Sequence, residues 1–127
     1  MSFEIISTDK APRPTASYSQ ATKFGKILFT AGQIPHDPKS GEIVGSIIEA
    51  QTRQTLENLK SLREAAGYSL SDVSKVLVFL KRTDDFAGMN RVYSEYFKTN
   101  PPARSTVQAE MMNPKLLIEL EAVSCRN

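Results

Sequence analysis

Apolar residues recur at every third or fourth position between Ser46 and Ala66, which is the period of a helix with one buried face. Ser46 and Glu49 have the spacing of a capping box, in which both side chains accept hydrogen bonds from backbone N–H groups at the helix start. Gly67 follows the last apolar position and suits the left-handed residue that ends many helices. The pattern therefore predicts a helix over residues 46–66.

A second stripe with helical spacing lies further along the chain and consists of Phe86, Met89, Tyr93 and Phe97. Thr83 precedes this stripe and can cap the helix, while two aspartates follow it in the first turn, where the helix dipole favours anions. The prolines at 101 and 102 cannot continue a helix. We therefore expect a second helix that begins after Thr83 and ends before Asn100.

Runs of β-forming residues predict strands at 3–6, 19–24, 26–33, 73–81, 104–111 and 116–124. The run at 73–81 is largely apolar, which is typical of a central strand with both faces covered. Residues 112–115 (MNPK) are typical of a turn, so the last two strands are expected to form a hairpin. The order of elements predicts an α+β domain with one mixed sheet and two helices packed on one face.

Strand side chains alternate between the two faces of a sheet, which divides the last two strands into apolar and polar sets. We expect the apolar set to face the helices; it comprises Val107, Ala109, Met111, Ile118, Leu120 and Ala122. The polar set would lie on the uncovered face; it comprises Arg104, Thr106, Gln108, Glu110, Glu119 and Glu121. Two interpretations of that face stay open, a solvated surface with ion pairs or a site that holds a small anion and a water.

Composition limits the classes of function. The chain has 127 residues, of which 40% are hydrophobic and 24% charged, and this suits a single globular domain over residues 1–127. A net charge of +2 gives no electrostatic reason to expect a nucleic acid as partner. No apolar run is long enough for a membrane span, so no membrane partner is expected. Residues 1–10 resemble neither a secretory signal nor a transit segment, which favours a cytoplasmic protein and keeps a mitochondrial one as the alternative.

The chain offers few metal-binding side chains. One cysteine, Cys125, excludes an intramolecular disulfide and a thiolate cluster. One histidine, His36, excludes a site built from several histidines. His36 lies in a turn-rich loop and Cys125 lies near the C-terminus, and neither is expected to have a functional role.

Several short segments stand out when they are taken together and in order: YSQA (18–21), AGQIP (31–35), QTRQ (51–54) with LEN (56–58), DFA (85–87) with Asn90 and Tyr93, PPARS (101–105) and IELEA (118–122). With these segments the chain resembles the RidA family (also called YjgF/YER057c/UK114), whose members are enamine and imine deaminases. The resemblance extends from residue 10 to residue 123. It implies a chorismate-mutase-like α+β fold, assembled as a homotrimer around a central barrel, with clefts between subunits.

The resemblance also implies a reaction, namely hydrolysis of 2-imino acids such as 2-iminopropanoate and 2-iminobutanoate to 2-keto acids and ammonia. It implies no cofactor and no metal. Arg104 matches the family arginine that binds the substrate carboxylate, and its planar fork suits a bidentate contact. Glu119 matches the carboxylate that positions the attacking water as a general base. Glu121, on the same face, ranks second for this role.

Other site residues have plausible structural roles as well. Tyr18 is expected to close over the substrate, or else to pack beside the proline-rich loop. Gly32 would offer a backbone N–H with no Cβ in the way, or form a plain bulge. Asn90 matches a family asparagine near the cleft. Each of these three residues is assigned to substrate binding.

The sequence departs from the common family pattern at two site positions. Ala31 stands where many members have serine, and it is assigned to substrate binding with one hydrogen-bonding group fewer. Thr106 stands where many have cysteine, and its hydroxyl could help to hold the water, so it is assigned to catalysis. These departures keep a second hypothesis open, a binding module that holds a keto acid without chemistry. A ribonuclease or translation inhibitor is a third hypothesis, against which the low charge and single histidine argue.

Overall fold

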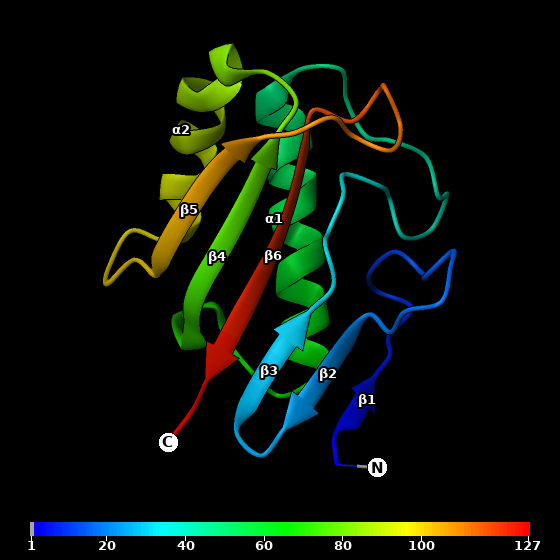
Figure 1. Cartoon of the computed structure of the whole chain (residues 1–127), viewed down its shortest axis with the longest axis vertical. Coiled ribbons are helices and arrows are strands. Elements are labelled where there is room, and N and C mark those ends of the chain that lie inside the picture. The colour runs from blue at the N-terminus through cyan, green and yellow to red at the C-terminus, as the bar shows by residue number, and fades with distance from the viewer. Residues whose placement is uncertain (1) are drawn as a thin grey trace.

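The computed structural model describes residues 2–127 and contains one six-stranded mixed sheet with both long helices behind one of its faces (Figure 1). The strands lie in the order β1-β2-β3-β6-β4-β5. Their bounds are β1 Glu4–Ile6, β2 Ala21–Phe24, β3 Ile27–Thr30, β4 Val73–Leu80, β5 Ala103–Gln108 and β6 Ile118–Cys125. Neighbouring strands are antiparallel except β4 and β5, which are parallel. The predicted α+β class, with two helices on one face, is confirmed.

The predicted hairpin of the last two strands is wrong, because β4 lies between β5 and β6. The chain leaves β4, passes through α2 and returns as β5 parallel to β4, as a strand–helix–strand crossover requires. β6 then pairs with the other edge of β4. The side chains of Val76, Val78 and Leu80 are almost fully buried, so this central position satisfies the apolar run that the sequence placed in the middle of the sheet.

Helix α1 spans Ile48–Ala65 and covers the sheet with the apolar stripe that the sequence predicts. Its start differs from the prediction, since Ile47 is the N-cap residue and no side chain caps the helix. Glu49 does not reach back to the helix start and instead accepts a hydrogen bond from Arg91 of α2 at 2.8 Å. The end agrees with the prediction, because Gly67 has a φ of 82° and its N–H donates to the carbonyl of Glu64.

Helix α2 spans Phe86–Tyr96 and follows a single 3₁₀ turn at Thr83–Asp85. Thr83 does not cap this helix, because the 3₁₀ turn places Asp85 at the N-cap position of α2. The main core lies between the helices and the sheet and includes Leu56, Leu59, Val76, Val78, Met89, Ile118 and Leu120. No helix among residues 2–127 combines the length and the apolar character needed to cross a bilayer.

A second, smaller core includes Leu28 of β3 and Leu62 of α1 and lies beside a buried arginine. Arg63 has no exposed surface, and its Nε donates to Oγ of Ser124 at 2.8 Å. Its Nη2 donates to the carbonyl of Ser69. Burial lowers the pKa of Arg63 to about 10, which leaves it charged at neutral pH. This guanidinium therefore joins α1 to the end of β6 and to the turn before β4.

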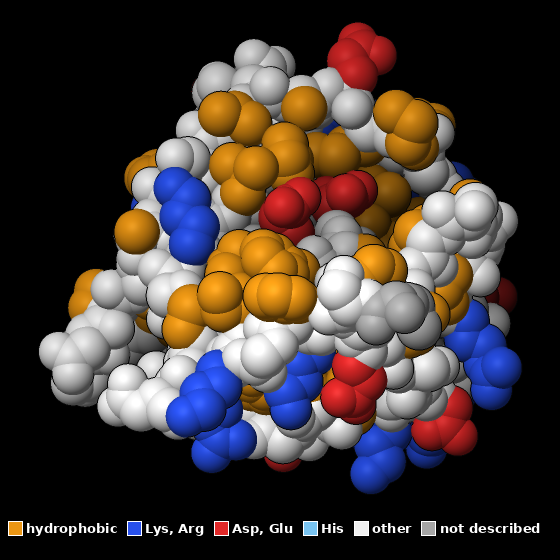
Figure 2. All heavy atoms as spheres, turned by 60° about the horizontal axis from the view of Figure 1, so that its bottom comes forward, with side chains coloured by type: hydrophobic (Ala, Val, Ile, Leu, Met, Phe, Trp, Pro, Cys, Tyr) orange, Lys and Arg blue, Asp and Glu red, His pale blue; other side chains and the backbone are white. Residues whose placement is uncertain are grey.

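The sheet face without helices, here called the open face, is apolar over much of its area. The strand registers place on it the partly exposed side chains of Ile5, Phe24, Ile27, Phe29 and Val107. Glu119 and Glu121 share this face, because Ile118, Leu120 and Ala122 point into the core. Figure 2 shows acidic side chains enclosed by apolar ones on the surface of the molecule.

Candidate active site

Arg104 of β5 lies on the helix side of the sheet, in contact with one face of α2. Its Nη1 donates to Oδ1 of Asn90 at 2.8 Å. Its Cζ lies 4.7 Å from the ring centroid of Tyr93 and 5.5 Å from that of Phe86, which are cation–π distances. A guanidinium has five N–H donors, so this setting fixes the group while leaving donors for a ligand.

An ion pair between Arg104 and the acidic residues of β6, the alternative that the sequence left open, does not form within one chain, since no carboxylate among residues 2–127 lies within salt-bridge distance of Arg104. The face predicted for each set of β5 side chains is also wrong, because Arg104 and Thr106 face the helix layer and Val107 is 45% exposed on the open face. The prediction assumed that the uncovered face is polar. In the structure that face carries Glu119 and Glu121 but is apolar over much of its area, and the guanidinium of Arg104 instead contacts the aromatic rings of α2 on the helix side.

Two side chains that contact Arg104 were interpreted from the sequence as core residues only. Phe86 and Tyr93 belong to the apolar stripe of α2, but their rings also flank the Arg104 guanidinium. Burial raises the pKa of the Tyr93 hydroxyl, and the positive charge of Arg104 offsets only part of this increase. The hydroxyl therefore stays protonated, and the ring next to the guanidinium is uncharged. The signal was present in the sequence, because Phe86, Asn90 and Tyr93 have the i, i+4, i+7 spacing of one helix face.

Thr106 occupies the same side of β5 as Arg104, two residues further along the strand, opposite Val78 of β4. Its Oγ1 is buried and has no hydrogen-bond partner among the described residues. A buried hydroxyl without a partner is unfavourable, so this group is available to a bound molecule or water.

Glu119 of β6 lies against Gly32, which follows β3. A β-carbon on residue 32 would lie 2.0 Å from Oε2 of Glu119, so only glycine permits this approach. Hydrogen bonds between Gln33 and Leu120 hold the two segments together, with Gln33 N donating to Leu120 O at 2.6 Å and Leu120 N donating to Gln33 O at 3.0 Å. Gly32 is thus the residue that makes room for the predicted catalytic carboxylate.

Burial raises the pKa of Glu119, and the negative charge of Glu121 raises it further. The two residues are separated by one position and point to the same face of β6. A carboxylate with a raised pKa is a stronger base, and therefore better suited to take a proton from water near neutral pH.

Arg104 and Glu119 lie on opposite faces of the sheet within one chain. Val76 of β4 pairs with Arg104 and faces the core, whereas Phe79 pairs with Glu119 and faces the open side. The predicted polar constellation of one arginine beside two glutamates is therefore not assembled by a single chain. The site residues form two groups, Arg104, Thr106 and Asn90 on the helix side, and Glu119 and Gly32 near the open side.

Ala31 is hydrogen-bonded to the segment that carries Tyr18, through the backbone of Gln20. The N–H of Ala31 donates to the carbonyl of Gln20 at 2.8 Å. The buried side chain of Gln20 holds the preceding loop, since its Oε1 accepts from the N–H of Thr8 at 2.7 Å and its Nε2 donates to the carbonyl of Pro12 at 2.9 Å. Tyr18 is 50% exposed at the end of this loop, so its ring is free to contact a ligand or another chain.

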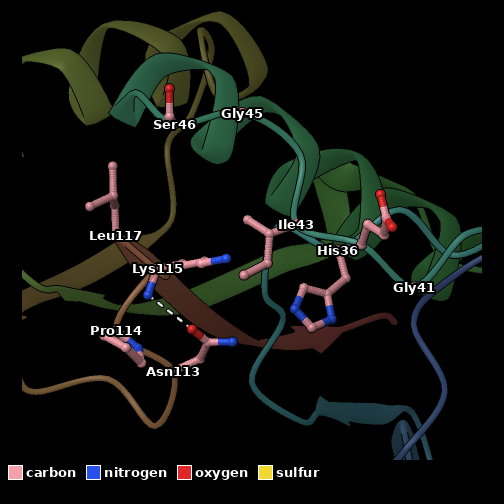
Figure 3. Close-up of a pocket in the computed structure, with 10 residues that line it drawn as sticks. His36, Gly41, Ile43, Gly45, Ser46, Asn113, Pro114, Lys115 and Leu117 are labelled. Atoms are coloured by element: carbon pink, nitrogen blue, oxygen red, sulfur yellow. Dashed lines mark hydrogen bonds between the residues drawn. The ribbon is translucent and has the colours of Figure 1, made fainter.

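A further cavity lies away from both groups (Figure 3). It measures about 720 Å³ and is open to solvent between the loop at 36–46 and the segment at 113–117. His36, Ser46 and Lys115 line it, and burial lowers the pKa of His36. Glu42 also lines it, so the cavity carries charges of both signs. None of the predicted site residues lies in its wall, and its size alone assigns it no chemistry.

Metal ligands do not converge in the described part of the chain, where no three side chains of His, Cys, Asp or Glu come together. Cys125 is exposed and unpaired with another cysteine. The predicted site residues supply a guanidinium with free donors, a hydroxyl, and a carboxylate with a raised pKa.

Comparisons with known proteins give a consistent picture. A family model described as Endoribonuclease L-PSP matches residues 8–125. A RutC family protein of Pyrococcus horikoshii is 56% identical over 121 residues, which cover 95% of this chain and 96% of that protein. The 2-iminobutanoate/2-iminopropanoate deaminase of Salmonella typhimurium is 40% identical over 126 residues, which cover 97% and 98%. The crystal structure of E. coli TdcF with bound serine matches with a TM-score of 0.92 and 38% identity, over 98% of this chain and 99% of that one.

Proposed function

Because the chain belongs to the L-PSP endoribonuclease family, also called the RidA or YjgF family, we propose that it hydrolyses 2-imino acids to 2-keto acids and ammonia. Its substrates would be 2-iminopropanoate and 2-iminobutanoate, which the name of the Salmonella relative gives. In this reaction the oxygen of water bonds to C2, the C2–N bond breaks, and ammonia leaves after the nitrogen gains a proton.

The observation that carries the proposal is the fixed guanidinium of Arg104, held by Asn90 at 2.8 Å and by two aromatic rings. A bound carboxylate would accept two parallel N–H bonds from its free edge. Holding the substrate there orients C2 for attack, and orientation accounts for a large part of many rate enhancements.

Glu119 would take the proton of the attacking water as the general base. Its raised pKa suits this role, and Gly32 leaves room beside it for the carboxylate. Thr106 would donate or accept a hydrogen bond at the reacting centre, since its hydroxyl lacks another partner. The C=N carbon of a protonated imine is already electrophilic, so modest activation of the water is sufficient.

A second copy of the chain would complete the site. Arg104 and Glu119 face opposite sides of one sheet, so a substrate that contacts both requires them from different chains. The apolar open face would be buried in the homotrimer that the family resemblance implies, with its barrel at the centre and clefts between subunits. Tyr18 and Ala31 would then line the same cleft as Glu119.

A binding module without chemistry is the second candidate. The TdcF structure contains bound serine, which is an amino acid and not an imine, and the chain has alanine at 31 and threonine at 106. In this case Arg104 would hold the carboxylate of a keto or amino acid and no hydrolysis would follow. A ribonuclease is a weaker candidate, because its usual acid–base pair of histidines is not available in a chain with one histidine.

A coupled assay tests the proposal. A threonine dehydratase generates 2-iminobutanoate in place, and release of the keto acid is followed with and without the protein. We expect faster release with the wild-type chain and a loss of that acceleration with Arg104→Ala. Release at the rate of the protein-free control would reject the deaminase, and tight binding of 2-ketobutyrate under the same conditions would favour the binding module.

A further inference from the structure

Two hollows lie near Arg104, and they differ in chemistry. One measures about 380 Å³ and is lined by Arg104 itself with Asn90, Tyr93, Ser94, Phe97 and two prolines, Pro101 and Pro102. The other, here called the Phe86 hollow, measures about 250 Å³ and is lined by Leu80, Thr83, Phe86, Thr106, Val107 and Gln108. The first is open and carries polar groups, whereas the second is walled mainly by apolar carbon.

The Phe86 hollow is linked to Arg104 through the Phe86 ring, which contacts the guanidinium and lines the hollow. The ring of Phe86 lies 5.5 Å from Cζ of Arg104 and also forms a wall of the hollow. Thr106 shares the face of Arg104 and lies two residues away, which is about 7 Å along a strand. A small acid held at the guanidinium therefore has its next carbon atoms within reach of this hollow.

The ring of Phe86 is only partly covered within one chain. Its side chain is 43% exposed although it begins the apolar stripe of α2. A large ring that is left open beside a cation and an empty apolar hollow is typical of a ligand-binding wall. Thr106 also lines the hollow, and its buried hydroxyl has no hydrogen-bond partner among the described residues.

We propose that the Phe86 hollow binds the side chain of the acid whose carboxylate Arg104 holds, and that the site therefore prefers 2-imino and 2-keto acids with branched aliphatic side chains. This inference rests on the proposed role of Arg104 as the carboxylate anchor. A methyl side chain leaves most of 250 Å³ unfilled, whereas a side chain of four carbons covers the Phe86 ring and removes its apolar surface from water. The substrate class is thus extended from the smallest imino acids to leucine-like ones.

Titration calorimetry with two stable keto acids tests this preference without requiring turnover. Pyruvate has a methyl side chain and 4-methyl-2-oxopentanoate has a branched one, and both carry the same carboxylate. Three proteins are compared: the wild type, Thr83→Leu and Ser94→Leu. Thr83→Leu fills the Phe86 hollow, whereas Ser94→Leu fills the hollow that Arg104 itself lines. Both substituted residues are exposed, so the two variants are matched in chemistry and in setting.

We expect the wild type to bind 4-methyl-2-oxopentanoate about tenfold more tightly than pyruvate, a ratio equivalent to about 1.4 kcal/mol. Thr83→Leu should reduce this ratio to about one, and Ser94→Leu should keep it near the wild-type value. Should Thr83→Leu not fold, Thr83→Val gives a smaller reduction in the same direction. Equal binding of both acids by the wild type, or a ratio that only Ser94→Leu lowers, would overturn the inference.

A different result in the same titrations would contradict the proposed function. If Arg104→Ala binds both keto acids as tightly as the wild type, the carboxylate anchor is wrong, whatever the ratio of the two affinities. If Arg104→Ala loses both acids while Thr83→Leu keeps the wild-type ratio, the anchor stands and only the Phe86 hollow is excluded.

Discussion

Gly32 and Glu119 are in such close contact that a β-carbon on residue 32 would lie 2.0 Å from Oε2 of the glutamate. The two residues come from segments almost ninety positions apart in the sequence and are brought together by the pairing of Gln33 with Leu120. The glycine is therefore required by the position of one carboxylate and not by a turn.

Gly32→Ala should reduce catalysis more than stability. The new methyl group meets the end of the Glu119 side chain, which can rotate away, so the fold survives while the carboxylate moves. Because a displacement of about 1 Å at a catalytic group can cost up to about a hundredfold in rate, we expect kcat to fall by about tenfold or more. The kcat and the Tm are measured on the same preparation, and an unchanged kcat would show that the position of Glu119 does not matter.

Arg104→Lys should fail to replace the arginine although it keeps the charge. A lysine cannot present two parallel donors to a carboxylate, and it loses the planar stacking on Tyr93. We expect kcat/KM to fall by about tenfold to a hundredfold, which corresponds to about 1.5–3 kcal/mol for hydrogen bonds to a charged group. Lys75→Arg is a suitable control, since Lys75 lies on β4 beside Ala103 and outside the site. An Arg104→Lys variant with wild-type kcat/KM would contradict a bidentate anchor.

The pH dependence of the rate should reflect the interaction between Glu119 and Glu121. Burial and Glu121 raise the pKa of Glu119 above the ordinary value of 4.5, so the rate should fall as the pH is lowered through this raised pKa and the base becomes protonated. Glu121→Gln removes the repulsion and should move the acid limb of the kcat/KM profile to lower pH. A limb that stays in place in Glu121→Gln would mean that burial alone sets the pKa.

The raised pKa of Glu119 also affects stability. Low pH lowers the rate, but it favours the folded state as far as Glu119 is concerned. A carboxyl whose pKa is raised in the folded state favours folding most when protonated, so its contribution is present below pH 4.5 and is lost as the pH rises through the raised pKa. Compared with the wild type, Glu119→Gln should therefore have a higher unfolding free energy at pH 7 relative to its value at pH 4. Denaturant unfolding at the two pH values measures this difference, and an equal pH response in both proteins would argue against a raised pKa.

Arg63 should be important for stability and not for catalysis. It is fully buried, donates to Ser124 at 2.8 Å and joins α1 to β6. Arg63→Ala leaves a cavity and an unpaired hydroxyl, and we expect a loss of about 2–4 kcal/mol in the free energy of unfolding. Ser124→Ala, which removes only the acceptor, should cost less. A loss below about 1 kcal/mol for Arg63→Ala would contradict its structural role.

The sequence predicted the helices well because their patterns are local. The stripe from Ile48 to Ala66 and the left-handed Gly67 each depend on neighbours within four residues. The capping box failed because Glu49 found a partner on another element, Arg91, which no local pattern reveals. The contact with Arg91 changed how the start of the helix is capped, but the helix itself formed as predicted.

The order of the strands could not be predicted from local patterns. A turn at 112–115 suggested a hairpin, but the buried strand β4 takes a neighbour on each side, and the crossover through α2 delivers β5 to one of them. The face of β5 was wrong for a related reason, since the aromatic rings that attract Arg104 lie on α2, more than ten residues away in the sequence. The site residues were identified by resemblance, whereas their division between two faces required the structure.

The most direct test of a site shared between chains uses two variants that are each expected to be inactive. Arg104→Ala and Glu119→Ala chains are co-expressed at equal levels, and the mixed protein is assayed for 2-iminobutanoate hydrolysis. If each site takes Arg104 from one chain and Glu119 from the next, about one quarter of the sites in randomly assembled oligomers are intact, and about one quarter of the wild-type activity should return. Activity no higher than the mean of the two separate variants would contradict the account.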